Sequence, residues 1–234
     1  MRYYFVFLFA FLTHTVEAQV MLPAYQGVQY KAGIAGCGTL TINHLAANGV
    51  APVDKTVTYG TVTGIPGEPA KCWITSNLGA SQQATAVNDA TEASAGWYWQ
   101  FDLKKGYKHD GTIATPTWSF ASYTPPGNWS ATVDPCTLEL GAGWRIPTST
   151  EWINIDESGG WAIRADQWNS GLKLHGAGSI TSGNLVARGG QSMYWSSTYI
   201  SKMAGAYNLQ GSSGYSEVGN YPTSYAFPLR CIKD

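Results

Sequence analysis

Four widely spaced cysteines constrain the fold of this chain more than any other feature of its sequence. They are Cys37, Cys72, Cys136 and Cys231, and no two of them lie closer than 35 residues apart. Structural zinc sites use cysteine pairs separated by about two to four residues, so this spacing favours disulfides. Four cysteines allow three pairings. We expect the sequential one, Cys37 with Cys72 and Cys136 with Cys231, in which the second bridge closes a loop of 95 residues.

The N-terminus predicts export. Residues 1–18 start with a single arginine, continue with a short apolar run and end in the small-x-small sequence Val16-Glu17-Ala18. This is the layout of a secretory signal peptide. A membrane anchor is the alternative, but a spanning helix needs about 20 apolar residues. We therefore expect a secreted or cell-surface protein with no membrane span, a leader segment or early strand at 19–36, and one domain over 37–234.

The low charge of the chain narrows the class of partner. Only 12% of the residues are charged, and the formal net charge is −1. Nucleic-acid binding usually depends on a basic patch, and the sequence has no cluster of Lys or Arg, so no nucleic-acid partner is expected.

Aromatic residues make up 13% of the chain, including ten Trp. Buried rings supply much of the core of such a domain, and the composition predicts a compact exported fold.

Short strands are expected along the whole domain. Runs rich in β-branched or aromatic residues, bounded by Gly, Pro or Asn, predict strands. These runs lie at 39–44, 56–62, 72–75, 96–101, 194–198, 204–209 and 227–232. Residues 80–95 are expected to form a loop or a weak helix, and residues 104–135 irregular chain.

Two helices are expected in the second half. Thr148 and Glu151 have the spacing of a capping box, which predicts a helix over 149–156. Apolar residues at helical spacing predict another over 161–172. The expected fold class is α+β, with two helices and short twisted antiparallel strands held by disulfides.

Several blocks of sequence resemble one known family. They are KCWITSNLG at 71–79, DPC at 134–136, GWRIPT at 143–148 followed by Glu151-Trp152, YWSST at 194–198, and LRCIKD at 229–234. In this order, and with matching cysteines, they are similar to the signature of the Fibrobacter succinogenes major paralogous domain family. The resemblance covers residues 37–234 and implies a C-type-lectin-like fold close to the formylglycine-generating-enzyme branch.

The residues of these blocks also have ordinary structural explanations. Arg145 and Glu151 flank a helix start, where the helix dipole favours a carboxylate. Trp144, Trp152 and Trp195 are expected to pack in the core and to touch no ligand.

Residue types that carry catalysis or bind metals do not form a clear site in the sequence. His44, His109 and His175 have no metal-ligand spacing, so we expect surface or loop histidines, no metal site and no cofactor. The carboxylates Glu151, Asp156 and Glu157 suggest a glycosidase pair, but they share one predicted helix, and the first already serves as its cap. No catalytic residue is expected.

The family resemblance suggests two further activities, and the sequence lacks the residues that each requires. Formylglycine-generating enzymes use a closely spaced cysteine pair, which this chain lacks, so that activity is not carried over. Calcium-dependent sugar binding in C-type lectins uses Glu-Pro-Asn or Gln-Pro-Asp together with Trp-Asn-Asp. The segments Glu68-Pro69-Ala70 and Trp168-Asn169-Ser170 each lack one ligand and occur in the wrong order, so this mode of sugar binding is not expected.

The C-terminal region has the composition of a binding surface. Residues 191–230 contain eight Ser, six Tyr, four Gly and two Asn, but only three charged residues. Antibody paratopes favour these residue types, because Tyr gives a large contact area at low entropic cost. An ordinary Gly/Ser/Tyr-rich β region is the alternative. The candidate ligand-contacting residues are Tyr199, Ile200, Ser201, Met203, Tyr207, Gln210, Ser213, Tyr215, Glu217, Tyr221 and Tyr225.

The family resemblance implies that such a face can be variable, because some members are targets of diversity-generating retroelements that mutate adenine-rich codons in this interval. We therefore expect a ligand-binding protein of the adhesin or receptor type, whose partner is an unknown protein or glycan on another cell or surface. Two alternatives remain open: a fixed structural or interaction module of the cell surface, and an enzyme of the formylglycine-generating or glycan-acting kind.

Overall fold

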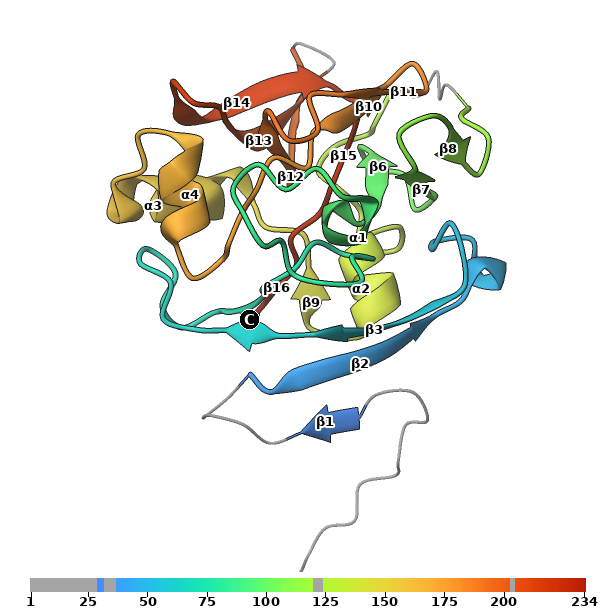
Figure 1. Cartoon of the computed structure of the whole chain (residues 1–234), viewed down its shortest axis with the longest axis horizontal. Helices are drawn as coiled ribbons and strands as arrows, with labels where there is room; N and C mark the ends of the chain where they lie inside the picture. Colours follow the sequence, from blue (N-terminus) through green and yellow to red (C-terminus); the bar gives the residue numbers. More distant parts are fainter. Residues whose placement is uncertain (1–28, 32–36, 120–123, 203–204) are drawn as a thin grey trace, which may run out of the picture.

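The computed structural model describes residues 29–31, 37–119, 124–202 and 205–234. The expected signal peptide and all of the leader segment except residues 29–31 lie outside them. In the described part the chain is a mixed helix and sheet protein with mostly strands, arranged in four small antiparallel sheets (Figure 1). Among these residues no helix is long and apolar enough to cross a membrane.

The sequential disulfide pairing is confirmed. Cys37 bonds Cys72, and Cys136 bonds Cys231, with Cα atoms 5.8 and 5.6 Å apart. All four cysteines of the chain are therefore bridged, which fits a secreted or extracellular protein.

Three of the blocks that carry the family resemblance, those at 71–79, 143–148 and 229–234, meet in one central sheet. Its strands are β4 (Thr61–Val62), β5 (Cys72–Ile74), β16 (Ile232–Lys233) and β9 (Trp144–Arg145), in that order. The C-terminal strand β16 lies between β5 and β9. In Figure 1 it descends through the middle of the molecule to the C-terminus. Segments far apart in sequence are thus joined by backbone hydrogen bonds, with a disulfide bridge on Cys72 and another on Cys231.

The N-terminal sheet lies along the bottom of Figure 1. It contains β1 (Gln29–Lys31), β2 (Thr39–His44) and β3 (Lys55–Tyr59), with the 3-10 helix η1 (Ala46–Asn48) between the last two. The predicted strand at 39–44 is confirmed. The one predicted at 56–62 is divided at Gly60 between β3 and β4, which belong to different sheets. A Cβ at Gly60 would lie 2.8 Å from the Thr75 hydroxyl, so a larger residue would require a shift at this close crossing.

Another of the four sheets has six strands. Its strands are β11 (Asn184–Val186), β10 (Ser179–Thr181), β15 (Ala226–Phe227), β6 (Tyr98–Gln100), β7 (Gly106–His109) and β8 (Ala114–Thr115), in that order. The weak helix expected within 80–95 is the single turn α1 (Glu92–Ala95).

The expectation of irregular chain over 104–135 is wrong in part. The segment contributes β7 and β8, and α2 (Pro135–Leu140) begins at its end. Asp134 caps α2 by accepting from the Cys136 and Thr137 backbone N–H groups. An Asp N-cap followed by Pro at the first helical position is a helix-start signal, and it explains why the irregular chain ends here.

The capped helix α3 (Ser149–Gly159) is confirmed and runs three residues further than predicted. The Thr148 side chain accepts from the Glu151 N–H, and the Glu151 carboxylate accepts from the Thr148 N–H, so the capping box is complete. Trp152 of this helix is buried, as are Trp144 and Trp195, so the core assignment of these three rings is confirmed.

The second predicted helix is wrong in length and in its buried face. Helix α4 spans only Arg164–Asn169. Asp166 accepts from the backbone N–H groups of residues 162 and 163, which sets the helix start after Trp161. The fully buried residue of α4 is Gln167, whereas Trp168 is partly exposed.

An ion cluster ties the C-terminus to α3. Arg145 donates to both carboxylate oxygens of Glu151 at 2.6 and 2.8 Å and to Asp234 at 2.7 and 3.1 Å. Lys71 donates to the same Asp234. Burial alone would raise the pKa of Glu151, but hydrogen bonds from Arg145 and the Thr148 backbone hold it below its ordinary value.

We expect Glu151→Gln to lower the free energy of unfolding at pH 7 by about 1–2 kcal/mol, because it weakens a charge-assisted cluster and the cap. The folded-state pKa is depressed, so this stability is present above the unfolded value of about 4.3 and is lost as pH falls through the folded value. Urea unfolding of Glu151→Gln and of the exposed control Glu157→Gln at pH 7 and at acidic pH measures both effects. Equal losses in the two variants would contradict the role of the cluster.

Candidate binding surface

The C-terminal candidates lie on a three-stranded sheet made of β12 (Ser192–Ile200), β13 (Gly205–Gly211) and β14 (Ser216–Pro222). Strand β13 is central, and its residues 205–211 pair in register with 222–216 of β14. The sheet occupies the top of Figure 1, next to α3 and α4. Strand β14 was not predicted.

An irregularity in β12 connects this sheet to the start of α3. Pairing with β13 shifts between Trp195 and Tyr199, and the residues in between turn their polar groups to other segments. The Ser197 N–H donates to the Pro147 carbonyl at 2.7 Å, and the Thr198 hydroxyl accepts from the Ser149 N–H at 3.0 Å. The YWSST segment therefore joins the three-stranded sheet to the start of α3.

Strand parity divides the candidate residues between two faces, because alternate residues of a strand point to opposite sides. Tyr207 shares the face of Leu209, which packs with Trp152 and Ile155 of α3. Ile200 has the same parity in β12, since it pairs with Gly205. These two candidates are therefore separated from those on the opposite face of the sheet.

The opposite face collects four of the candidates. Tyr199 pairs with Ala206, and Ala206 with Tyr221, so these three share a side of the sheet. Gln210 and Glu217 also pair across the strands and join through a 2.7 Å hydrogen bond. Of the remaining candidates, Ser201 and Ser213 lie in the two turns at opposite ends of the hairpins, and Met203 lies outside the described residues.

Four tyrosines form what we call the tyrosine face: Tyr199, Tyr215, Tyr221 and Tyr225. Each is partly exposed. Tyr199 stacks on Phe101 with ring centroids 6.0 Å apart. Tyr221 and Tyr225 lie 5.3 Å apart, and both contact Phe227.

Burial raises the pKa of Tyr215, and the neighbouring Tyr221 and Glu217 add to the effect. Tyr215 directly precedes β14, in the turn between β13 and β14. Three of the four rings of this face are held against aromatic residues of the core, so they would lose little conformational entropy on binding a partner.

The expectation of surface histidines is wrong, because all three are buried: His44, His109 and His175 are 0%, 1% and 1% exposed. His175 does lie in a loop, whereas His44 and His109 lie in β2 and β7. His44 bonds Glu139 through Nδ1 and the Tyr59 hydroxyl through Nε2, at 2.8 Å in the second case. These contacts join the N-terminal sheet to α2. Sequence spacing missed this pairing, because Glu139 lies 95 residues away.

The carboxylates considered as a glycosidase pair are engaged elsewhere. Glu151 belongs to the ion cluster with Arg145. Asp156 accepts a hydrogen bond from Ser216, and burial raises its pKa. In the described part of the chain, no three His, Cys, Asp or Glu side chains gather as a metal site would require.

No protein-family model, curated protein or solved structure matches this chain. The family resemblance is therefore carried by its sequence blocks alone and stays a prediction. What the geometry adds is a separation of roles. Three of the blocks build the central sheet and its ion cluster, whereas the YWSST block lies in β12, the strand that also carries Tyr199 of the tyrosine face.

One further surface feature was missed from the sequence. A hollow of about 370 Å³ lies between α3, α4 and the loop before β5, and Trp161 lines it. The helical spacing of residues 161–172 placed Trp161 on a helix, so its position in a loop next to a cavity was not foreseen.

Proposed function

We propose that this chain is an exported, non-catalytic binding protein with a C-type-lectin-like fold, and that its partner is a protein or glycan on another cell or surface. The tyrosine face is the observation that carries the proposal. Tyrosines that are partly exposed and held by core rings are the residue type enriched in binding hot spots. The convergence of three family blocks on one disulfide-linked sheet supports the lectin-like scaffold.

The chemistry of the buried polar residues supports binding over catalysis. A formylglycine-generating activity needs a reactive thiol, and all four cysteines are disulfide-bonded. A glycosidase needs two carboxylates facing one cavity, whereas Glu151 and Asp156 have separate partners.

Alanine substitution tests the tyrosine face. We expect Tyr199→Ala, Tyr215→Ala and Tyr221→Ala each to weaken binding by roughly tenfold, and the triple variant by more than about a hundredfold, as for aromatic residues central to an interface. The measurement is capture of residues 19–234 on arrays of extracellular proteins and glycans, with and without chelator. Tyr→Phe variants preserve the packing and separate lost contact from lost folding.

The matched control is Tyr207→Ala, because Tyr207 lies in the same sheet but on the face toward α3. Thermal unfolding is measured for every variant. Binding that is unchanged in the triple variant would refute the assignment.

A fixed surface module is the second candidate, and one observation favours it: the rings of Tyr199, Tyr221 and Tyr225 also pack on the core. Sequencing this coding region across a growing population distinguishes the two. Substitutions concentrated at adenines in codons 193–228, with Trp195 and Cys231 unchanged, indicate a diversified binding face. A uniform sequence indicates a fixed module.

A further inference from the structure

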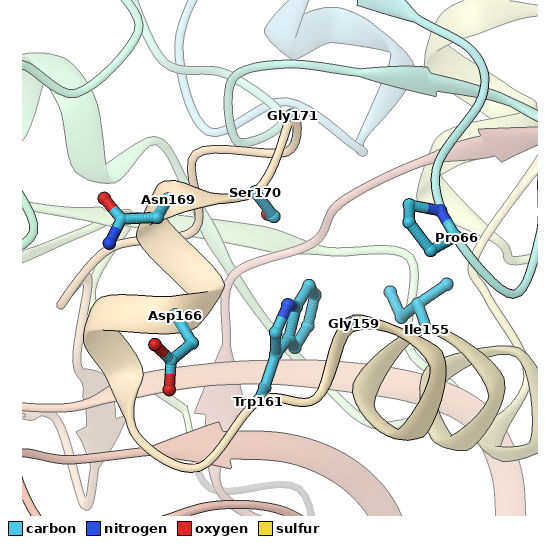
Figure 2. Close-up of a pocket in the computed structure, with 8 residues that line it drawn as sticks. All are labelled: Pro66, Ile155, Gly159, Trp161, Asp166, Asn169, Ser170 and Gly171. Carbon is cyan, nitrogen blue, oxygen red and sulfur yellow. The ribbon is translucent and has the colours of Figure 1, made fainter.

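The hollow beside Trp161 has the construction of a preformed small-ligand site. Figure 2 shows the indole standing between α4 on one side and Ile155 and Pro66 on the other. Its volume of about 370 Å³ falls in the range of small-molecule pockets, about 300–1,000 Å³.

The indole is held in place by the end of α3. Gly160, the C-cap of α3, has a left-handed backbone conformation. The backbone N–H of Trp161 donates to the Asp156 carbonyl at 3.0 Å. This is the Schellman arrangement, which sets the path of the chain just after a helix. A Cβ at Gly159 would lie 2.5 Å from Trp161 Nε1, so the ring rests directly on the backbone of the last helical residue.

The other walls are also held by local contacts. The Asn154 amide donates to Glu68 at 2.6 Å, which attaches the loop containing Pro66 to α3. The Ser170 hydroxyl donates to the Gln167 carbonyl and accepts from the Leu172 N–H, which shapes the turn after α4. The hollow is therefore formed before any ligand arrives.

Three polar groups of the lining residues have no hydrogen bond to the described residues. Asp166 uses Oδ2 to accept from two backbone N–H groups, while its Oδ1 has no bond to the described residues. The Trp161 indole N–H and the Asn169 amide likewise have no partner there. In Figure 2 the Asn169 amide points away from the indole, so it stands at the rim.

These groups indicate a neutral, hydroxyl-rich ligand. Hydroxyls can donate to the Asp166 carboxylate and accept from the indole N–H, and sugar C–H groups pack on the negative face of an aromatic ring. Among the described residues that line the hollow, Asp166 alone carries a charge, which disfavours anionic ligands. Quaternary ammonium ions are recognised by cages of several aromatic rings, whereas this lining contains one.

We propose that the hollow between α3 and α4 is a binding site for a pyranose ring of a neutral glycan, with Trp161 as the stacking platform and Asp166 as the hydrogen-bond acceptor. The site is separate from the tyrosine face, because none of its lining residues belongs to that surface. It involves no calcium ion.

Nuclear magnetic resonance of residues 19–234 tests the proposal. The indole N–H peak of Trp161 is assigned by its loss in Trp161→Phe, and cellobiose, maltose and N,N′-diacetylchitobiose are titrated separately to millimolar concentrations. We expect at least one of them to shift this peak together with the backbone amides of Gly159 and Gly171. Failure of all three sugars overturns the proposal, and so does a larger shift with tetramethylammonium.

Variants identify the residues responsible, with the Gly171 amide as the readout. Asp166→Asn keeps an acceptor for the helix start but removes the charge, and we expect it to weaken binding roughly tenfold. Gly159→Ala should abolish binding by displacing the indole. Trp168→Phe is the matched control, because Trp168 is partly exposed on the same helix without lining the hollow, and it should bind as the unmodified chain does.

The triple tyrosine variant should also bind the sugar unchanged, which separates this site from the proposed function. Binding that survives Gly159→Ala and Trp161→Ala would contradict the assignment even if a sugar bound.

Discussion

Replacing Cys136 and Cys231 together by alanine is expected to lower the free energy of unfolding by about 4–5 kcal/mol. The bridge spans 95 residues, and in the chain-entropy model a loop of that length accounts for about 4.7 kcal/mol. Both cysteines are fully buried, and they join α2 to the segment before β16. The bridge therefore connects the two ends of the second half through the core.

The other disulfide is the internal control. It spans 35 residues, which corresponds to about 3.8 kcal/mol in the same model, and Cys37 is partly exposed. Urea unfolding should therefore give a lower free energy of unfolding for Cys136→Ala/Cys231→Ala than for Cys37→Ala/Cys72→Ala. An equal or smaller loss for the longer bridge would contradict this interpretation.

Mild acid is expected to destabilise the protein through His175. This side chain is 1% exposed, and neither ring nitrogen has a partner among the described residues. Burial, followed by the nearby Arg230, lowers the pKa of His175 to about 3. Arg164 and Arg188 lower it further, whereas Asp89 acts in the opposite direction.

The direction of the pH effect follows from proton binding. The folded pKa of His175 is below the unfolded value of about 6.5, so between these values the unfolded chain binds a proton that the folded chain does not. Stability therefore falls as pH drops below about 6.5, and it continues to fall until about pH 3. One pH unit corresponds to about 1.4 kcal/mol, which gives roughly 2 kcal/mol between pH 6.5 and 4.5.

The test compares the unmodified chain with His175→Leu, which cannot be protonated. Urea unfolding at both pH values should show that the variant loses about 2 kcal/mol less than the unmodified chain does. The matched comparison is Glu157→Gln, an exposed change that should leave the pH response as it is. The same pH response in His175→Leu would show that His175 is protonated equally in both states.

The folding predictions that succeeded rest on local signals. The capping box at Thr148 and Glu151 and the β-branched run at 39–44 each contain their own boundary information, and both elements form where predicted. Strand β14 was missed because residues 216–222 include Gly and Asn and lack clear alternation. Its formation depends on pairing with β13, which a single segment does not reveal.

The candidate site was foreseen in composition but not in geometry. Residues 192–222 of the Tyr-rich interval supply the three strands of one sheet, yet Tyr207 and Ile200 face away from the tyrosine face. Parity decides this, and it depends on a strand register that composition cannot supply. The buried histidines were missed for a related reason: the partners of His44 are Tyr59, on the neighbouring strand, and Glu139, on a distant helix.

A substitution scan of residues 192–234, displayed on yeast, would test most directly whether scaffold and binding roles are separate. Each variant is sorted for surface expression, which reports folding, and for capture of the array probe that the unmodified chain binds. Variants at Tyr199, Tyr215 and Tyr221 should lose capture and keep expression, whereas those at Trp195, Arg230 and Cys231 should lose both. If capture falls only where expression falls, at every position, this sheet carries no binding face.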